Sequence, residues 1–253
     1  MNTTLFNPAD SSDAIDAGVL PCLDNEGKIL LDTKSSVAVA PDGNGGLYAG
    51  LFKAQSSKNS SSVLDDMKAR GIQYLHTHGV DNCLVRVADP AFVGYCINKK
   101  ADCGNVVVRK TQAEESVGVI ALRNGTWGVV EYSEIPASLS QAKTPSGELV
   151  FRAANIANHF FTVEFLDRIH ALGEDDMPFH IARKKIPYVD LKSGQRIKPT
   201  KPNGMKLELF IFDVFPFSQN MAVLEVQRQD FFSPLKNAPN TGVDDPQTYV
   251  AFE

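Results

Sequence analysis

Short apolar runs that suit strands alternate with segments that suit helices, and this alternation limits the fold more than any other feature. Residues 72–77 form an apolar run typical of a buried strand. A helix is predicted from Pro90, because Asp89 can cap its start and proline fits its first turn. A further apolar strand is expected at 106–108. This succession predicts an α/β fold with a mixed sheet flanked by helices.

Capping signals place two more helices. Ser62 is a suitable N-cap, Asp65 follows at the third helical position, and Gly71 lies just past the expected end. A second helix is expected over roughly 162–171, for which Asn158 is a candidate cap. The segment before Ser62 is rich in serine and resembles a surface insertion.

A hairpin and two later strands complete the expected sheet. Asn124-Gly125 stands between the apolar runs 117–122 and 127–132, which is the strongest short-range hairpin signal. Further strand-like runs occupy 207–214 and 222–226.

The charge balance narrows the class of partner. The net charge is −5 and the pI about 5.6, which argues against nucleic acid or an anionic membrane as the main partner. Neither a leader segment nor a membrane-spanning run is visible, so a cytoplasmic protein is expected. The spacing of the cysteines fits neither a zinc site nor a redox pair, so reduced structural thiols are expected at Cys22, Cys83, Cys96 and Cys103.

A glycine-rich turn is the first candidate binding segment. In residues 41–46, three glycines in four positions would let a ligand approach the backbone closely. Asn44 can offer both an amide donor and an acceptor. A surface turn without function has the same composition, so that alternative stays open.

Asp81 is expected directly after the strand at 72–77, where ligands of open α/β sheets bind. A carboxylate there can hold Mg²⁺ beside bound phosphates. The alternative is that Asp81 or Asn82 only caps the turn. His76 and His78 have no third ligand nearby in the sequence, so structural histidines are expected rather than a metal pair.

Glu131 and Asn155 are candidate sugar contacts. Glu131 closes the hairpin and could accept hydrogen bonds from two hydroxyls, with Tyr132 expected on the opposite face of the strand. Asn155 lies too early to cap the helix at 162–171 and is freer to contact a ligand. A solvated edge glutamate is the alternative for Glu131.

Lysines and phenylalanines near the C-terminal part are ambiguous. Lys206 and Lys236 could meet phosphate, although a lone lysine is usually a solvated surface charge. Phe210 and Phe212 are expected on one face of the strand at 207–214, where core packing is their default role.

Together, these segments resemble the eukaryotic UDP-N-acetylglucosamine pyrophosphorylases. Matching stretches follow the family's order over about residues 19–247: VAVAPDGNGGLY, RGIQYLHTHGVDNCLVRVADPAFVGYC, KADCG, VEYSEI, NIANHFFTVEFL, KKIPYVD, KPNGMKLELFIFD and FSPLKNA. The resemblance implies a nucleotide-diphospho-sugar transferase fold and uridylyl transfer from UTP to N-acetylglucosamine-1-phosphate. The open alternatives are another sugar-1-phosphate as acceptor, or an inactive remnant that binds sugar phosphate weakly.

The resemblance also implies roles for single residues. Gly43 and Asp81 would contact UTP, with Asp81 beside Mg²⁺. Lys206 would meet the triphosphate, and Lys236 the attacking and α-phosphates. The implied contacts of the sugar are Asn44, Gly118, Glu131, Tyr132 and Asn155, with Phe210 and Phe212 on the acetamido side.

Two departures from the family set further expectations. The glycine-rich loop LxGGxGTRLG has no counterpart, and a glutamine pair is replaced by Asp16-Ala17. We therefore expect a divergent tail at 1–18, a partial catalytic domain at 19–237, and a truncated tail at 238–253. Such a segment would be incomplete at both ends, would have little activity alone, and could associate through an exposed sheet edge.

Overall fold

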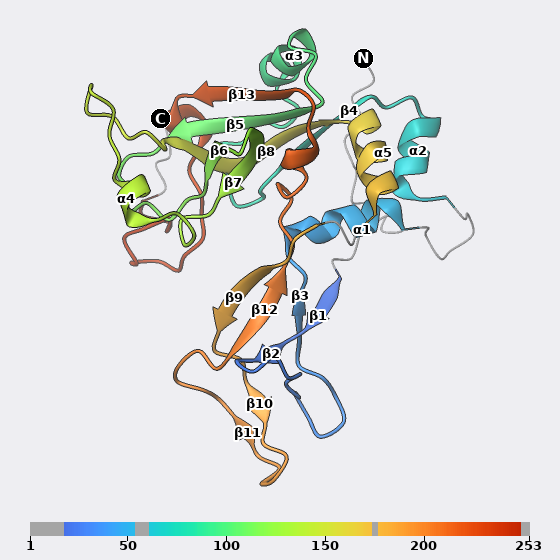
Figure 1. Ribbon diagram of the computed structural model, residues 1–253, viewed down its shortest axis with the longest axis vertical. Coiled ribbons are helices and arrows are strands. Elements are labelled where there is room, and N and C mark those ends of the chain that lie inside the picture. The colour runs from blue at the N-terminus through green and yellow to red at the C-terminus, as the bar shows by residue number, and fades with distance from the viewer. Residues whose placement is uncertain (1–17, 54–60, 174–176, 249–253) are drawn as a thin grey trace. The chain divides into compact units, whose positions relative to one another are not determined.

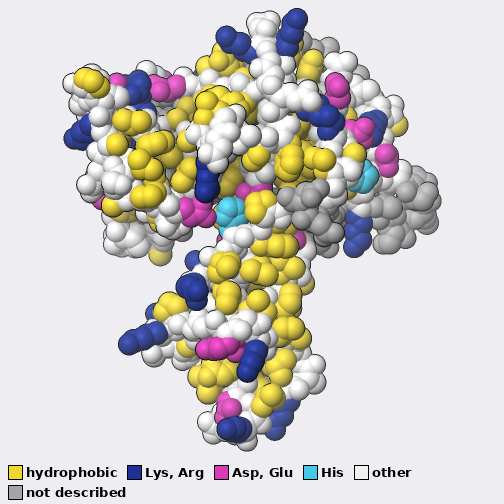
Figure 2. All heavy atoms as spheres, in the orientation of Figure 1, with side chains coloured by type: hydrophobic (Ala, Val, Ile, Leu, Met, Phe, Trp, Pro, Cys, Tyr) yellow, Lys and Arg dark blue, Asp and Glu magenta, His cyan; other side chains and the backbone are white. Residues whose placement is uncertain are grey.

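A computed structural model describes residues 18–53, 61–173 and 177–248 (Figure 1). The described residues form two compact units. The first unit comprises 70–169 and 215–248, and the second comprises 18–69 and 170–214. Residues 1–17 of the tail expected at 1–18, and most of the serine-rich segment, lie outside the described residues. On the face shown in Figure 2, acidic and basic side chains are interspersed, in keeping with the small net charge of −5.

A six-stranded mixed sheet forms the first unit (Figure 1). Its strand order is β13-β5-β8-β6-β7, and β4 also pairs with β8. β13 runs parallel to β5, whereas the other pairs are antiparallel. The predicted mixed sheet is therefore confirmed. Its strands are β4 (Tyr74–His78), β5 (Cys103–Arg109), β6 (Val119–Arg123), β7 (Thr126–Val130), β8 (Ala153–Thr162) and β13 (Met221–Val226).

One helix covers a face of this sheet and begins as predicted. α3 (Pro90–Asn98) starts with proline, and Asp89 Oδ1 accepts a hydrogen bond from the Ala91 N–H at 2.9 Å. Phe92 and Cys96 are buried against alternate residues of β5, β8 and β13. Burying a side chain such as Phe92 contributes roughly 1.5–3 kcal/mol, so this core does much to hold the unit together.

Local turn chemistry fixes the hairpin. Asn124 and Gly125 both have positive φ, 53° and 83°, between β6 and β7. That conformation matches the right-handed twist of the paired strands and suits asparagine and glycine. The predicted hairpin is confirmed.

The opposite face of the sheet is aromatic. His159 and Phe161 of β8 contact Phe215 in η3 (Phe215–Phe217), and Phe161 stacks on Phe165 in α5 (Val163–Leu172). α5 confirms the helix expected over 162–171 to within one residue at each end. Its cap was predicted wrongly, because Thr162 Oγ1 accepts the Phe165 N–H at 3.0 Å.

Two strands were placed with errors, and β8 was not predicted. Asn158, the expected cap, lies inside β8, which runs on to Thr162. β4 is half-buried rather than buried, and Tyr74 is 40% exposed. The run at 207–214 is a strand only as far as Glu208, where β12 ends. Asp213 stops it, because its Oδ2 accepts the Phe210 N–H at 2.7 Å and closes a turn.

The second unit contains short sheets around a small core. β12 (Gly204–Glu208) pairs with β2 (Leu23–Asp24) and β9 (His180–Lys184), while β1 (Val19–Pro21) pairs with β3 (Val39–Pro41). β10 and β11 form a further pair. The remaining elements of both units are η1 (Asn44–Gly46), α1 (Leu47–Phe52), α2 (Val63–Ala69), α4 (Ala137–Ser140), β10 (Tyr188–Val189), β11 (Arg196–Ile197) and α6 (Arg228–Phe231).

The sequence predictions for the α2 cap and for three of the four cysteines are confirmed. Ser62 Oγ accepts the Asp65 N–H at 3.1 Å, and Asp65 Oδ2 accepts the Ser62 N–H at 3.0 Å, which is a reciprocal cap for α2. All four cysteines are free. Three are buried, and burial raises the pKa of Cys96 to about 12. Cys83 is exposed, so it has no packing role.

Candidate functional site

Asp81 and Lys236, two predicted catalytic residues, are neighbours in the first unit. Lys236 Nζ lies 3.7 Å from Asp81 Oδ2, and the two side chains are 40% and 52% exposed for Asp81 and Lys236 respectively. The backbone brings them together, because the Leu235 N–H donates to the Asp81 carbonyl at 2.9 Å and the Cys83 N–H donates to the Ser233 carbonyl at 3.3 Å. A carboxylate and an ammonium group that both reach solvent here can meet a metal-bound or free phosphate.

Asn82 holds this pair of segments in place. It is 4% exposed, its Nδ2 donates to the Phe231 carbonyl at 2.8 Å, and its Oδ1 accepts the Ser233 N–H at 3.0 Å. The structural alternative therefore applies to Asn82, which uses its amide to tie two loops together. Asp81 keeps its carboxylate at the surface beside Lys236.

Gly118, Glu131 and Asn155, three predicted sugar contacts, also lie together. The Asn155 N–H donates to the Gly118 carbonyl at 2.9 Å. A Cβ added to Gly118 would lie 2.6 Å from Glu131 Oε1, so Glu131 packs over the bare backbone and any larger residue at position 118 would displace it. The sheet thus places a carboxylate and an amide side by side.

The pairing of β6 with β7 and β8 puts Gly118 and Asn155 on one face of the sheet. Val119 faces Val130 on one side and Ala154 on the other. Ala154 belongs to the core beneath α3, so the residues next in sequence turn to the opposite face.

Glu131 and Tyr132 do not follow strand alternation, contrary to expectation. β7 ends at Val130, and the Glu131 carbonyl accepts the N–H groups of Glu134 at 2.9 Å and Ile135 at 3.1 Å. A turn therefore sets the directions of both side chains. Tyr132 is 52% exposed.

His76 has a structural role, as expected. The Ala88 N–H donates to Nδ1 at 3.1 Å, so the ring proton is on Nε2, which lies 2.6 Å from Asn158 Oδ1. Burial lowers the pKa of His76, which keeps the ring neutral. Among the described residues, no group of three or more His, Cys, Asp and Glu side chains is placed to hold a metal ion.

The glycine-rich turn lies in the second unit, against the chain's own backbone. Gly43 has φ 95°, and a Cβ there would lie 2.3 Å from the Leu209 carbonyl oxygen. The Gly45 N–H donates to that oxygen at 2.9 Å. Asn44 Oδ1 accepts the Ile211 N–H at 2.9 Å, which leaves the Nδ2 of Asn44 for a ligand. The turn thus has a structural role, through its contacts with the segment 209–211.

Phe210 and Phe212 lie beside that turn but share no strand face, because the strand has already ended. Their ring centroids are 5.0 Å apart, and Phe210 lies 4.4 Å from the ring of His180. His180 Nε2 in turn lies 2.9 Å from Asp213 Oδ1. Phe212 is buried, whereas Phe210 is half-buried. Sequence reasoning missed His180 and Asp213, which are distant in the chain and carry no local motif.

The predicted site residues thus divide between the two units. Lys206 lies in β12, opposite Ala182 of β9. The first unit carries Asp81, Gly118, Glu131, Tyr132, Asn155 and Lys236. The second carries Gly43, Asn44, Lys206, Phe210 and Phe212.

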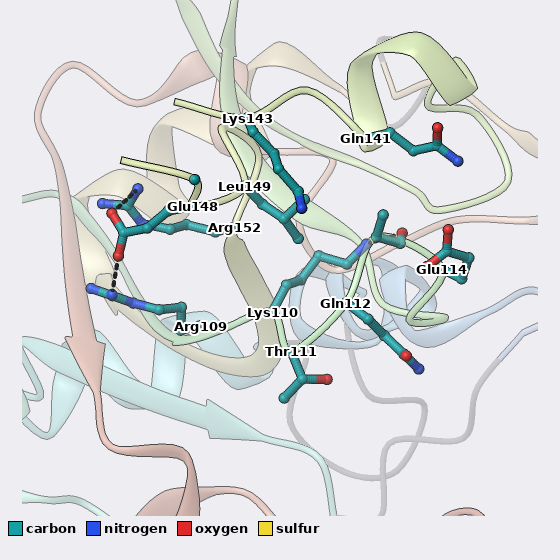
Figure 3. A pocket seen from close by; sticks show the side chains of 12 residues that line it. Arg109, Lys110, Thr111, Gln112, Glu114, Gln141, Lys143, Glu148, Leu149 and Arg152 are labelled. Atoms are coloured by element: carbon teal, nitrogen blue, oxygen red, sulfur yellow. Dashed lines mark hydrogen bonds and ion pairs between the residues drawn. The ribbon is translucent and has the colours of Figure 1, made fainter. Parts of the chain in front are cut away.

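A pocket of about 610 Å³ opens beyond the end of β5 (Figure 3) and contains none of the predicted residues. Glu148 lies 2.6 Å from Arg109 and 3.2 Å from Arg152, and Lys110 Nζ donates to the Ala113 carbonyl at 3.1 Å. Glu148 and the Ala113 carbonyl thus hold three of the cations that line the pocket.

The chain is similar in sequence to proteins that are named as pyrophosphorylases. The chain is 47% identical over 230 residues to "UDP-N-acetylhexosamine pyrophosphorylase-like protein 1" of Xenopus tropicalis, covering 91% of this chain and 43% of that protein. It is 43% identical over 235 residues to "UDP-N-acetylglucosamine pyrophosphorylase" of Saccharomyces cerevisiae, covering 91% of this chain and 48% of that protein. The chain therefore spans less than half the length of these relatives.

A solved structure shows the same fold. The uridine diphosphate N-acetylglucosamine pyrophosphorylase of Trypanosoma brucei superposes with a TM-score of 0.79 at 33% identity, over 92% of this chain and 45% of that one. No helix in the described ranges has the length and apolar character needed to cross a membrane.

Residues 12–244 match the family described as "UTP--glucose-1-phosphate uridylyltransferase". Since this match spans most of the sequence, the chain belongs to that uridylyltransferase family.

Proposed function

We propose that this chain provides the sugar-phosphate part of an enzyme that transfers the uridylyl group of UTP to N-acetylglucosamine-1-phosphate. The observation that carries the proposal is the presence, in one unit, of the Asp81–Lys236 pair and the Gly118–Glu131–Asn155 cluster. The relatives of yeast and Trypanosoma brucei are named for N-acetylglucosamine, which supports the choice of sugar.

Glu131 and Asn155 supply complementary groups for a sugar. The carboxylate accepts hydrogen bonds from ring hydroxyls, and such bonds to a charged group contribute about 1.5–3 kcal/mol. The Asn155 amide donates to an acceptor oxygen of the sugar phosphate. Gly118 keeps the space in which the carboxylate lies. The roles that the resemblance implies for Asn44, Tyr132, Phe210 and Phe212 stay predictions.

The reaction needs positioning and charge neutralisation more than acid–base chemistry. An oxygen of the sugar phosphate forms a bond to the α-phosphorus of UTP, and the bond from that phosphorus to the bridging β-oxygen breaks. Pyrophosphate leaves with the electron pair, and no proton has to move. Lys236 would neutralise the attacking phosphate and the α-phosphate, a contribution of the kind that a fixed electrostatic stabiliser makes. Lys206 is proposed to meet the triphosphate.

Mg²⁺ is proposed as the metal, with Asp81 as its protein ligand. Mg²⁺ usually binds one or two carboxylates and completes its coordination with water and phosphate oxygens. A single exposed carboxylate beside a lysine fits that pattern. When bound, the ion would supply positive charge to the phosphates of UTP.

The family description names glucose-1-phosphate, and this favours a second candidate acceptor. The two sugars differ at carbon 2, where N-acetylglucosamine carries an acetamido group. A site that prefers glucose-1-phosphate would have no group that recognises the acetamide. A cytoplasmic location and association through a sheet edge stay predictions.

Calorimetric titration of the purified chain with sugar phosphates tests the proposal. N-acetylglucosamine-1-phosphate should bind more tightly than glucose-1-phosphate, N-acetylgalactosamine-1-phosphate or inorganic phosphate. Release of pyrophosphate from UTP, Mg²⁺ and the preferred sugar phosphate then measures transfer. Equal affinity for all four ligands would contradict a sugar site, and a preference for glucose-1-phosphate would establish the second candidate.

A further inference from the structure

A row of polar side chains crosses the interior of the sheet in the first unit. Asn105 of β5 faces His159 of β8, and His159 faces Thr77 of β4. Asn105 and His159 are both fully buried. Burying polar groups costs about 1–3 kcal/mol each unless hydrogen bonds compensate. The hydrogen bonds that these residues form therefore determine which atoms donate and which accept along the row.

A bulge in β8 connects this row to Asn155. Two steps along β5, from Asn105 to Val107, oppose four steps along β8, from Asn155 to His159. Ala157 lies inside the bulge with φ 52°, a left-handed conformation that is rare for alanine. Its N–H donates to Asn155 Oδ1 at 3.2 Å. The side chain of Asn155 thus bends along its own strand toward Ala157.

That one backbone bond fixes the direction of every other bond in the row. A backbone N–H can only donate, so the atom of Asn155 that Ala157 contacts is the oxygen. Asn105 approaches the same oxygen at 3.2 Å and must do so with Nδ2. Its Oδ1 therefore faces His159 Nδ1, at 3.0 Å, and this imidazole nitrogen must carry the proton.

His159 is suited to hold this direction permanently. Its Nε2 is left as a buried lone pair, with no hydrogen-bond partner among the described residues. Loss of solvation lowers the pKa of His159 to about 3, so the ring stays neutral near pH 7. A neutral ring with its only proton on Nδ1 always donates toward Asn105.

We infer that Asn105 and His159 are positioning residues, which act through Asn155 to present its Nδ2 amide as a donor to the sugar phosphate. Both lone pairs of Asn155 Oδ1 are engaged, by Asn105 and Ala157, so Nδ2 is the polar group that can reach a ligand. It recognises an acceptor oxygen, such as an acetamido carbonyl or a phosphate oxygen. This inference rests on the sugar-binding role proposed for Asn155.

The Asn105→Asp variant tests the relay, because it keeps the shape of the side chain but removes the donor. Its carboxylate would repel Asn155 Oδ1 and favour the reversed amide. Affinity for N-acetylglucosamine-1-phosphate should fall about tenfold, with UTP affinity unchanged. Asn203→Asp is the matched control, since the side-chain amide of Asn203 bonds through both its atoms to the backbone of Ile186 in the second unit, and the change should leave sugar binding unchanged.

A pair of His159 variants separates positioning from packing. His159→Gln retains an amide donor toward Asn105 and should keep sugar affinity within about threefold, whereas His159→Leu should lose about tenfold. Asn155→Ala tests the proposed function itself. If Asn155→Ala leaves sugar binding intact, the proposed role of Asn155 is wrong. If it weakens binding while Asn105→Asp and His159→Leu do not, only the relay is wrong.

A measurement on the unaltered chain covers the case in which the variants fail to fold. Nitrogen-15 NMR of the histidine rings should show His159 protonated at Nδ1 and unprotonated at Nε2. Titration with N-acetylglucosamine-1-phosphate should shift the side-chain amide protons of Asn155. Finding the proton on Nε2 of His159 would overturn the relay, whereas ligand binding that leaves the Asn155 amide protons unmoved would overturn the proposed role of Asn155.

Discussion

The two units hold their candidate residues by different means. In the first unit, strand pairing and the backbone hydrogen bonds between the loops at 81–83 and 233–235 fix the backbone. The charged groups of Asp81, Glu131 and Lys236 extend from that backbone. In the second, the turn at 42–46 and the segment 209–213 bond to one another, and Gly43 and Asn44 serve that contact directly. Substitutions should therefore change chemistry in the first unit and folding stability in the second.

The largest effect is expected at Lys236. In a full-length context, Lys236→Met should reduce the rate of uridylyl transfer by ~10²–10³, as for loss of a fixed electrostatic stabiliser. Stability should change by less than about 1 kcal/mol, because its ion pair with Asp81 is exposed and such pairs contribute little. Single-turnover kinetics and thermal melting measure the two quantities. Near-normal turnover would make Lys236 an ordinary surface charge.

A substitution of Glu131 should change the affinity for the sugar phosphate without changing the affinity for UTP. Glu131→Ala is expected to weaken N-acetylglucosamine-1-phosphate by ~1.5–3 kcal/mol, while UTP affinity stays the same. Glu131→Gln, which keeps the size but not the charge, should lose less. Calorimetry with both ligands checks this. Equal losses for UTP and sugar phosphate would indicate a folding defect rather than a lost sugar contact.

A substitution of Gly43 tests the expectation that changes in the second unit affect folding stability. Gly43→Ala should destabilise the second unit by about 1–3 kcal/mol, because its backbone is left-handed and the new methyl group meets the Leu209 carbonyl. Gly27→Ala is a matched control, since Gly27 has φ 83° but no atom within 4 Å of an added Cβ. Chemical denaturation should show a larger loss for Gly43→Ala. Equal losses would mean that backbone strain alone, without the contact to Leu209, explains both.

A pH dependence of stability is expected in the first unit. The folded-state pKa of His159 is about 3, below the ordinary 6.5, so the unfolded chain binds more protons between those values. The free energy of unfolding should therefore fall as the pH drops from 6.5 toward 3, by at most about 1.4 kcal/mol per pH unit. Burial lowers the pKa of His76 as well, which acts in the same direction. Denaturation curves of His159→Gln should have a shallower slope, and an unchanged slope would contradict this assignment.

Several site residues could be predicted because the family's motifs carry them in order. Asp81, Glu131, Asn155 and Lys236 were named from the sequence, and the structure groups them in one unit. Asn105 was missed, although an amide inside the apolar run CGNVVV was a usable signal. The roles of all these residues, and the boundaries 1–18, 19–237 and 238–253, stay predictions.

Local features were determined by the sequence itself. The caps at Ser62 and Asp89 and the hairpin at Asn124-Gly125 involve residues only a few positions apart, so short-range hydrogen bonds and backbone preferences decide them. The mixed sheet also followed from the pattern of apolar runs.

Only the tertiary structure decided the features that join distant segments. The bulge at 155–159 depends on the pairing of β8 with β5, and the contact of Asp81 with Lys236 depends on loops tied by Asn82. A hydrogen bond from the Phe210 N–H to the Asp213 side chain ends β12, and strand propensities do not account for such a bond. In each case a polar side chain (Asn155, Asn82 or Asp213) forms a hydrogen bond with a group that the fold brings close. Leaving such a group buried without a hydrogen bond would cost free energy, and this favours the observed pairing.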